Sequence, residues 1–136
     1  MRSFVALLLL GSTLLSGCVR AYYTRPGTLK PAMASVTPAE RAAVWQHSVT
    51  ALLEQGYVPL VLNEAAGYVS ARRREDLVDD ALIGTMATVV VSPEGGVRVE
   101  VSGTGLYGSE QDFLNAVLQR QTDLLQAIVA ARPPAK

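Results

Sequence analysis

Apolar residues recur with two different periods along the chain, and the change of period separates predicted helices from predicted strands. Between Thr37 and Gly56 they return every three to four residues, which predicts an amphipathic helix. Its apolar stripe consists of Ala42, Trp45, Val49, Leu52 and Leu53. Thr37 and Glu40 form an N-terminal capping box around a proline, and Gly56 is placed to end the helix. We therefore expect Trp45 to anchor the core and His47 to face solvent.

The middle of the chain has the alternation and the β-branched content of strands. Four are expected: Tyr57–Leu62, Tyr68–Arg74, Thr85–Ser92 and Val97–Ser102. Turn sequences separate the first pair and the last pair, which favours an antiparallel meander with one buried face. Pro59 is typical of an edge strand. A meander leaves Val97–Ser102 as the other edge, and because this strand has no proline we expect it to accept a strand from a partner.

A second amphipathic helix is expected from Ser109 to about Arg132, ahead of two prolines. Its apolar stripe contains Phe113, Val117, Leu124 and Ile128, flanked by Leu114, Leu118 and Leu125. The order is then one helix, four strands and one helix. Two amphipathic helices and a one-sided sheet bury one another, so we expect an α+β fold. The predicted architecture is a two-layer sandwich, with an antiparallel four-stranded sheet and both helices on one face.

Residues 1–18, MRSFVALLLLGSTLLSGC, have the layout of a signal peptide, with a basic residue, a short apolar run and small residues at the end. The run is shorter than the ~20 apolar residues that span a bilayer. Leu15-Ser16-Gly17-Cys18 resembles the lipobox of bacterial lipoproteins. The resemblance implies that residues 1–17 are removed, that Cys18 receives a diacylglycerol thioether, and that the new amino group is acylated. Several acyl chains hold a protein durably on a bilayer.

This interpretation divides the chain into four parts. They are a signal peptide (1–17), a lipidated cysteine with a tether (18–36), a globular α+β domain (37–132) and a C-terminal tail (133–136). Prolines and a glycine break regular structure in the tether, and its adjacent Tyr22 and Tyr23 are expected to contact the bilayer interface or the domain surface.

The residue after the lipidated cysteine helps to determine which membrane a lipoprotein is sorted to. In Gram-negative lipoproteins an aspartate there favours retention in the inner membrane, and residue 19 of this chain is valine. The resemblance therefore implies the periplasmic face of the outer membrane. The inner membrane, or the surface of a cell with a single membrane, is the alternative address.

Composition and motifs argue against most kinds of chemistry. The 136-residue chain has 12 basic and 12 acidic side chains, a balance that argues against a nucleic-acid partner. One cysteine and one histidine leave no intramolecular disulfide and little for a metal site. Gly103, Gly105 and Gly108 fit a dinucleotide-binding spacing, but no strand is expected after the following helix to complete a βαβ unit. We therefore expect no catalytic residues, no metal and no cofactor.

Charged side chains on the strands are the candidates for partner contacts. Arg72 and Arg74 share the solvent face of their strand and suit lipid phosphates or an acidic partner, although the acids that follow them make a solvated strand end the simpler interpretation. Arg98 and Glu100 lie on the outer face of the expected binding edge, where they are placed to set the register with a partner's charges.

The expected function is a non-enzymatic, membrane-anchored binding or scaffolding module of the cell envelope, with an envelope protein as its partner. A carrier of lipid or of a small apolar ligand is the first alternative, and an enzyme is the second. The expected outline is similar to that of the helix-grip and related domains found in accessory lipoproteins of envelope assembly. This likeness is one of architecture, and a fold does not fix a function.

Overall fold

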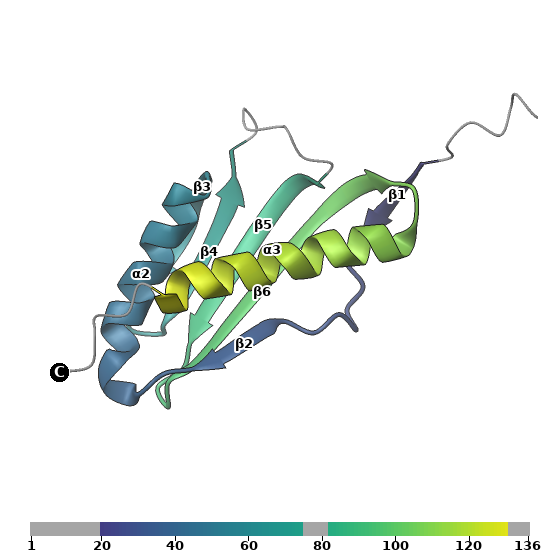
Figure 1. The fold of residues 1–136 in the computed structure, drawn as a ribbon. Coiled ribbons are helices and arrows are strands. Elements are labelled where there is room, and N and C mark those ends of the chain that lie inside the picture. Colours follow the sequence, from purple (N-terminus) through teal and green to yellow (C-terminus); the bar gives the residue numbers. More distant parts are fainter. Residues whose placement is uncertain (1–19, 75–81, 131–136) are drawn as a thin grey trace, which may run out of the picture.

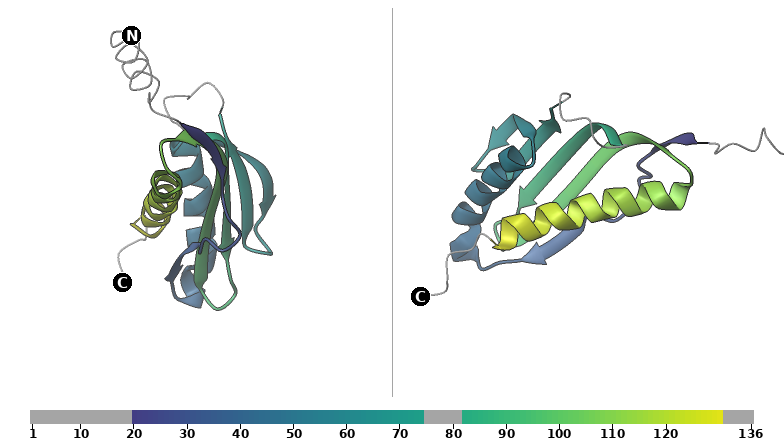
Figure 2. Two further views of the ribbon diagram at one scale, coloured as in Figure 1. Left: turned by 90° about the vertical axis from the view of Figure 1, so that its right-hand side faces the viewer. Right: turned by 45° about the horizontal axis from the view of Figure 1, so that its top comes forward.

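The computed structural model describes residues 20–74 and 82–130, and within them the chain forms a two-layer α+β sandwich (Figure 1). The elements are β1 (Ala21–Thr24), β2 (Ala32–Ser35), the short 3-10 turn η1 (Pro38–Glu40), α2 (Arg41–Glu54), β3 (Tyr57–Asn63), β4 (Tyr68–Arg73), β5 (Leu82–Val91), β6 (Gly96–Tyr107) and α3 (Glu110–Ala130). Both helices cover one face of the sheet, and the opposite face carries no helix of the described residues (Figure 2). The expected α+β class is confirmed.

The sheet of the described residues has six antiparallel strands, two more than the sequence predicts. The strand order is β1-β6-β5-β4-β3, and β2 also pairs with β6. Both additional strands come from the segment expected to be a tether, so residues 21–24 and 32–35 belong to the sheet instead. Each strand is only four residues long, which is too short to display a clear alternation.

The start of α2 follows the predicted capping box. The backbone N–H and the hydroxyl of Thr37 both donate to the Glu40 carboxylate, at 2.8 Å each. Gly56 lies just after the helix with a φ of 83°, a conformation that glycine adopts without steric cost. Both ends of this helix are therefore set by local sequence.

The buried face of α2 is rotated from the predicted stripe. Its buried residues are Val44, Ser48, Ala51 and Leu52. Trp45 is only half-buried, and its indole N–H donates to the carbonyl of Tyr68 at 3.4 Å. The ring thus closes the side of the core next to β4 and does not fill its centre. His47 is half-buried, whereas the sequence predicted a solvent-facing side chain.

The main core lies between the helices and the inner face of the sheet. It combines Val44 and Leu52 of α2, Leu124 and Ile128 of α3, and a layer of valines from β4, β5 and β6. A smaller cluster around Leu82, Phe113 and Val117 lies at the β1 end of the sheet. There the rings of Tyr23 and Tyr107 pack on Phe113, with centroids 5.9 and 5.6 Å away. The four predicted core positions of α3 are confirmed as fully buried.

Candidate binding edge

The strand expected to bind a partner lies inside the sheet. On the side of β6 away from β5, β2 pairs with Gly96–Val99 and β1 pairs with Thr104–Tyr107. The expectation that Val97–Ser102 forms an open edge is therefore wrong, because the N-terminal strands cover it. The predicted meander contained only four strands, so it had no strand on this side of β6.

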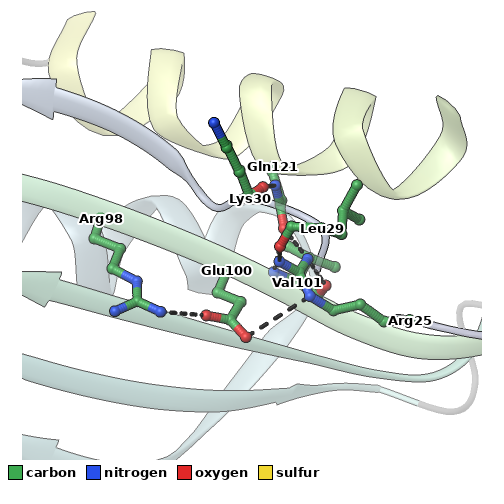
Figure 3. Close-up of polar contacts among 7 residues, drawn as sticks. All are labelled: Arg25, Leu29, Lys30, Arg98, Glu100, Val101 and Gln121. Atoms are coloured by element: carbon green, nitrogen blue, oxygen red, sulfur yellow. Dashed lines mark hydrogen bonds and ion pairs between the residues drawn. The ribbon is translucent and has the colours of Figure 1, made fainter. Parts of the chain in front are cut away.

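Between β2 and β1 the backbone of Val101 has no strand beside it. The N–H of Val36 donates to the carbonyl of Gly95 at 2.7 Å, and alternate residues of an antiparallel strand turn to the same neighbour. Val97, Val99 and Val101 therefore all direct their backbone groups to this side. The N–H of Val101 donates to Oε1 of Gln121 at 3.1 Å, and its carbonyl accepts from Nη1 of Arg25 at 2.8 Å (Figure 3).

Arg25 and Gln121 form the centre of a polar network that joins the N-terminal segment to α3. Arg25 also donates to Oε1 of Gln121, and its Nη2 donates to the carbonyl of Leu29 at 2.6 Å. Nε2 of Gln121 donates to the carbonyl of Lys30 at 3.1 Å. Gln121 is 1% exposed and the Arg25 side chain 8%. Two side chains thus replace a missing length of strand and seal this edge.

The burial of Arg25 changes the pKa of its side chain. Burial lowers the pKa of its guanidinium, while the Glu100 carboxylate, with Oε1 3.7 Å from Nε, acts in the opposite direction. Sequence reasoning missed both Arg25 and Gln121. The one available signal was a polar residue at position 121, on the apolar stripe that runs through Val117 and Leu124.

The structure does not gather the four predicted contact residues into one site. Nη2 of Arg98 pairs with the Glu100 carboxylate at 2.9 Å on the helix-free face (Figure 3). Arg72 lies on β4 in the row of Met86 and Ser102, whereas Arg98 lies in the row of Tyr68 and Val90. The N–H of Arg74 donates to the carbonyl of Gly56 at 2.9 Å. Cys18, the predicted lipidation site, lies outside the described residues.

The opposite edge of the sheet, formed by β3, is open. In the described part of the chain, no strand pairs with the outer side of β3. Its exposed apolar side chains are Val58 (46%), Leu60 (58%), Val61 (49%) and Leu62 (52%). No charged residue occurs between Tyr57 and Leu62. Edge strands are usually short or charged, so an uncharged apolar edge of this length marks a candidate binding surface.

The backbone of β3 shows where a second strand is able to pair. The bond from Arg74 to Gly56 lies one residue beyond the Tyr57–Arg73 pair. By alternation, Tyr57 and Pro59 direct their backbone groups away from β4. Pro59 has no N–H to offer, and a register shift follows between Pro59 and Val61. The sequence correctly predicted an edge strand here, and its proline and bulge limit indiscriminate pairing.

Two further features bear on chemistry at this surface. Tyr57 is 1% exposed, and burial raises the pKa of its hydroxyl, while the positive charges of Arg120 and Arg73 act against that rise. Among residues 20–74 and 82–130, no three or more His, Cys, Asp or Glu side chains are grouped so as to hold a metal ion.

An apolar groove lies between β2 and the end of α3. It is open to solvent and has a volume of about 510 Å³. The groove is lined by Ala34, Leu125, Gln126, Val129 and Ala130. It is thus built on the covered edge of the sheet, away from β3.

Comparison with known proteins adds no family. No protein-family model matches the chain, and no curated protein matches it. Of the helices in the described residues, none combines the length and apolar character needed to cross a bilayer.

Proposed function

We propose that this chain is a lipid-anchored, non-enzymatic binding module of the cell envelope, held on the periplasmic face of the outer membrane. The anchor is the lipid on Cys18, for which the lipobox-like Leu15-Ser16-Gly17-Cys18 is the support. The binding role rests on one observation, the exposed, uncharged apolar edge of β3. Its partner is an envelope protein that adds an extended apolar segment to this edge.

The chemistry of β3 favours a protein segment over a lipid surface. The strand presents outward backbone groups as well as apolar side chains. Hydrocarbon has no group that satisfies a backbone N–H or carbonyl, whereas an added strand satisfies both and offers side chains that cover Val58 and Leu60. The partner segment is expected to carry β-branched or aromatic residues and few charges, because β3 has no charge to pair with them.

The position of β3 also suits this role. β1, which follows Cys18 in the sequence, belongs to one edge of the sheet, and β3 forms the other. An anchor at the β1 edge leaves the β3 edge accessible from the periplasm. One domain is thus able to hold a membrane and a partner at the same time.

The anchor is tested by labelling with radioactive palmitate. Incorporation into the parent and none into Cys18→Ala is the expected result, and the variant should accumulate as uncleaved precursor. Equal labelling of the two chains would contradict the proposal.

The partner is tested by crosslinking in intact cells, with a photoreactive amino acid at position 60 of the full chain. The matched control carries it at Met33, which is also exposed and apolar but lies on β2. We expect a single envelope protein, identified by mass spectrometry, at position 60 only. Val61→Lys should abolish this product, because a lysine on an edge strand opposes pairing. A product composed of two copies of this chain, or equal products from positions 60 and 33, would overturn the proposal.

A carrier of small apolar ligands is the second candidate, and the groove beside Ala34 and Leu125 favours it. Its open side leaves a bound ligand in contact with water, which gives this function less support than the β3 edge gives partner binding. Saturable binding of a fluorescent fatty acid that is lost in Ala34→Glu and retained in Val61→Lys would reverse this preference.

A further inference from the structure

We propose that the helix-free face of the sheet rests on the bilayer at its β1 end, with Tyr22 and Ile83 in the interfacial region. This inference rests on the lipidation of Cys18 proposed above and goes beyond it, because it fixes which side of the domain meets the membrane. Three independent features carry it: the length of chain after the cysteine, the side chains at this end, and the charges around them.

The first feature is the short distance along the chain from the lipid to the sheet. Only Val19 and Arg20 separate Cys18 from Ala21, where β1 begins. Three extended residues span about 11 Å, whereas the tether predicted from sequence would reach roughly 60 Å. With the acyl chains in the bilayer, Ala21 must therefore lie close to the headgroups. The edge of the sheet that holds β1 is brought to the membrane with it.

The second feature is the set of side chains at this end of the helix-free face. Strand pairing places Tyr22 beside Leu106, and Thr24, Thr104 and Ile83 in one row across three strands. Tyr22 is 71% exposed and Ile83 50%. None of the five residues is charged. A tyrosine combines an apolar ring with a polar hydroxyl, the combination enriched at membrane interfaces.

The two adjacent tyrosines of β1 have opposite roles. Tyr23 turns to the helix side, where its ring stacks on Phe113 with centroids 5.9 Å apart. This contact holds β1 on the core, and it leaves Tyr22 pointing outward from a fixed strand. The orientation of Tyr22 is thus set by the fold and not by the lipid alone.

The third feature is charge. On the helix side of the same end, the first turn of α3 carries Glu110 and Asp112, both exposed. Lipid phosphates repel these carboxylates, so the helix side is held away from the headgroups. Arg20, exposed just before β1, suits the phosphates instead. Apolar contact on one side and repulsion on the other tilt the domain onto its helix-free face.

The test uses the purified, lipidated full chain in vesicles of phosphatidylethanolamine and phosphatidylglycerol with brominated acyl chains. The thioether consumes the thiol of Cys18, so an added cysteine is the only one that reacts with a fluorescent maleimide. Ile83→Cys carries the probe, and Leu60→Cys on β3 is the control. The two native side chains are similarly exposed, Ile83 at 50% and Leu60 at 58%. Circular dichroism checks that both variants keep the parent fold.

We expect bromine to quench the probe at 83 several-fold more than the probe at 60, and aqueous iodide to give the opposite order. Equal bromine quenching at the two positions would overturn the inference. Protection of position 83 from iodide without bromine quenching would overturn it too, because protein would then cover the patch. Mass spectrometry of the same samples separates the two proposals. A chain without lipid on Cys18 contradicts the anchor and the orientation together, whereas a lipidated chain with equal quenching contradicts the orientation alone.

Discussion

The β6 side of the sheet is bordered by two four-residue strands, whereas the β3 side ends in one strand of seven residues. On the first side, Arg25 and Gln121 bind the backbone of Val101 where the short strands leave a gap. On the second, apolar side chains stand in solvent and only Pro59 and a bulge restrict pairing. An edge can therefore be closed by side chains that imitate a strand, and this contrast is the reason why we propose β3 as the edge that binds a partner.

The largest effect is expected from breaking the seal of the covered edge. Gln121→Leu keeps the volume of the side chain but leaves the Val101 N–H and the Arg25 guanidinium without their shared acceptor. A buried polar group without a partner costs about 1–3 kcal/mol, so we expect a loss of about 3 kcal/mol in the free energy of unfolding. Urea unfolding followed by circular dichroism measures it.

Gln119→Leu is the matched control for this substitution. Gln119 lies on the same helix and is exposed, and among the described residues its side-chain Nε2 donates to Oδ1 of Asp123 at 2.7 Å. Its replacement should change the free energy of unfolding by less than about 0.5 kcal/mol. Similar losses at positions 119 and 121 would mean that the polar network is not what closes this edge.

The two edges also differ in how far their structure could be predicted from the sequence. Local signals defined both helices, because the Thr37–Glu40 cap and the spacing from Phe113 to Ile128 act within a few residues. The strands of the β3 side, β3 and β4, are seven and six residues long and were found as well. The covered edge was missed because its strands are short and its closure depends on Arg25 and Gln121, which are 96 residues apart.

The prediction of the candidate site also succeeded where local sequence was sufficient and failed where strand order was needed. Pro59 correctly predicted that its strand is an edge. The choice of the other strand as the binding edge depended on strand order, which no local pattern contains. The exposure of the apolar side chains of β3 was not predicted either. It depends on tertiary packing, because Tyr57 is buried on the helix side of the sheet and its neighbour Val58 therefore turns to the helix-free face.

A smaller effect is expected at alkaline pH, where Tyr57 links the open edge to the core. Burial raises the pKa of its hydroxyl in the folded protein, above the ordinary value of about 10 that it has when unfolded. Below pH ~10 both states hold the proton and stability is unaffected by this group. Above it the unfolded state ionises first, so the free energy of unfolding should fall by up to about 1.4 kcal/mol per pH unit.

Tyr57→Phe should remove most of this alkaline loss. Burial also raises the pKa of Tyr107, but that side chain is only half-buried, so Tyr107→Phe should remove less. Thermal melts between pH 8 and pH 11 compare the two variants. A slope that Tyr57→Phe leaves unchanged would show that another group governs the alkaline transition.

The smallest effect on stability, and the most direct test of the comparison, is expected from restoring the missing donor of the open edge. Pro59→Val supplies an outward N–H on β3 in a position where Pro59 faces no hydrogen-bonded partner on β4. The free energy of unfolding should change by less than about 1 kcal/mol. The edge would then offer a nearly complete row of backbone groups beside exposed valines and leucines, so self-association should increase with concentration in sedimentation velocity. Adding Leu60→Lys to the same chain should return it to the behaviour of the parent, since the charge opposes pairing without touching the core. If Pro59→Val stays as monodisperse as the parent, the proline is not what restrains this edge, and the bulge between Pro59 and Val61 becomes the feature that does.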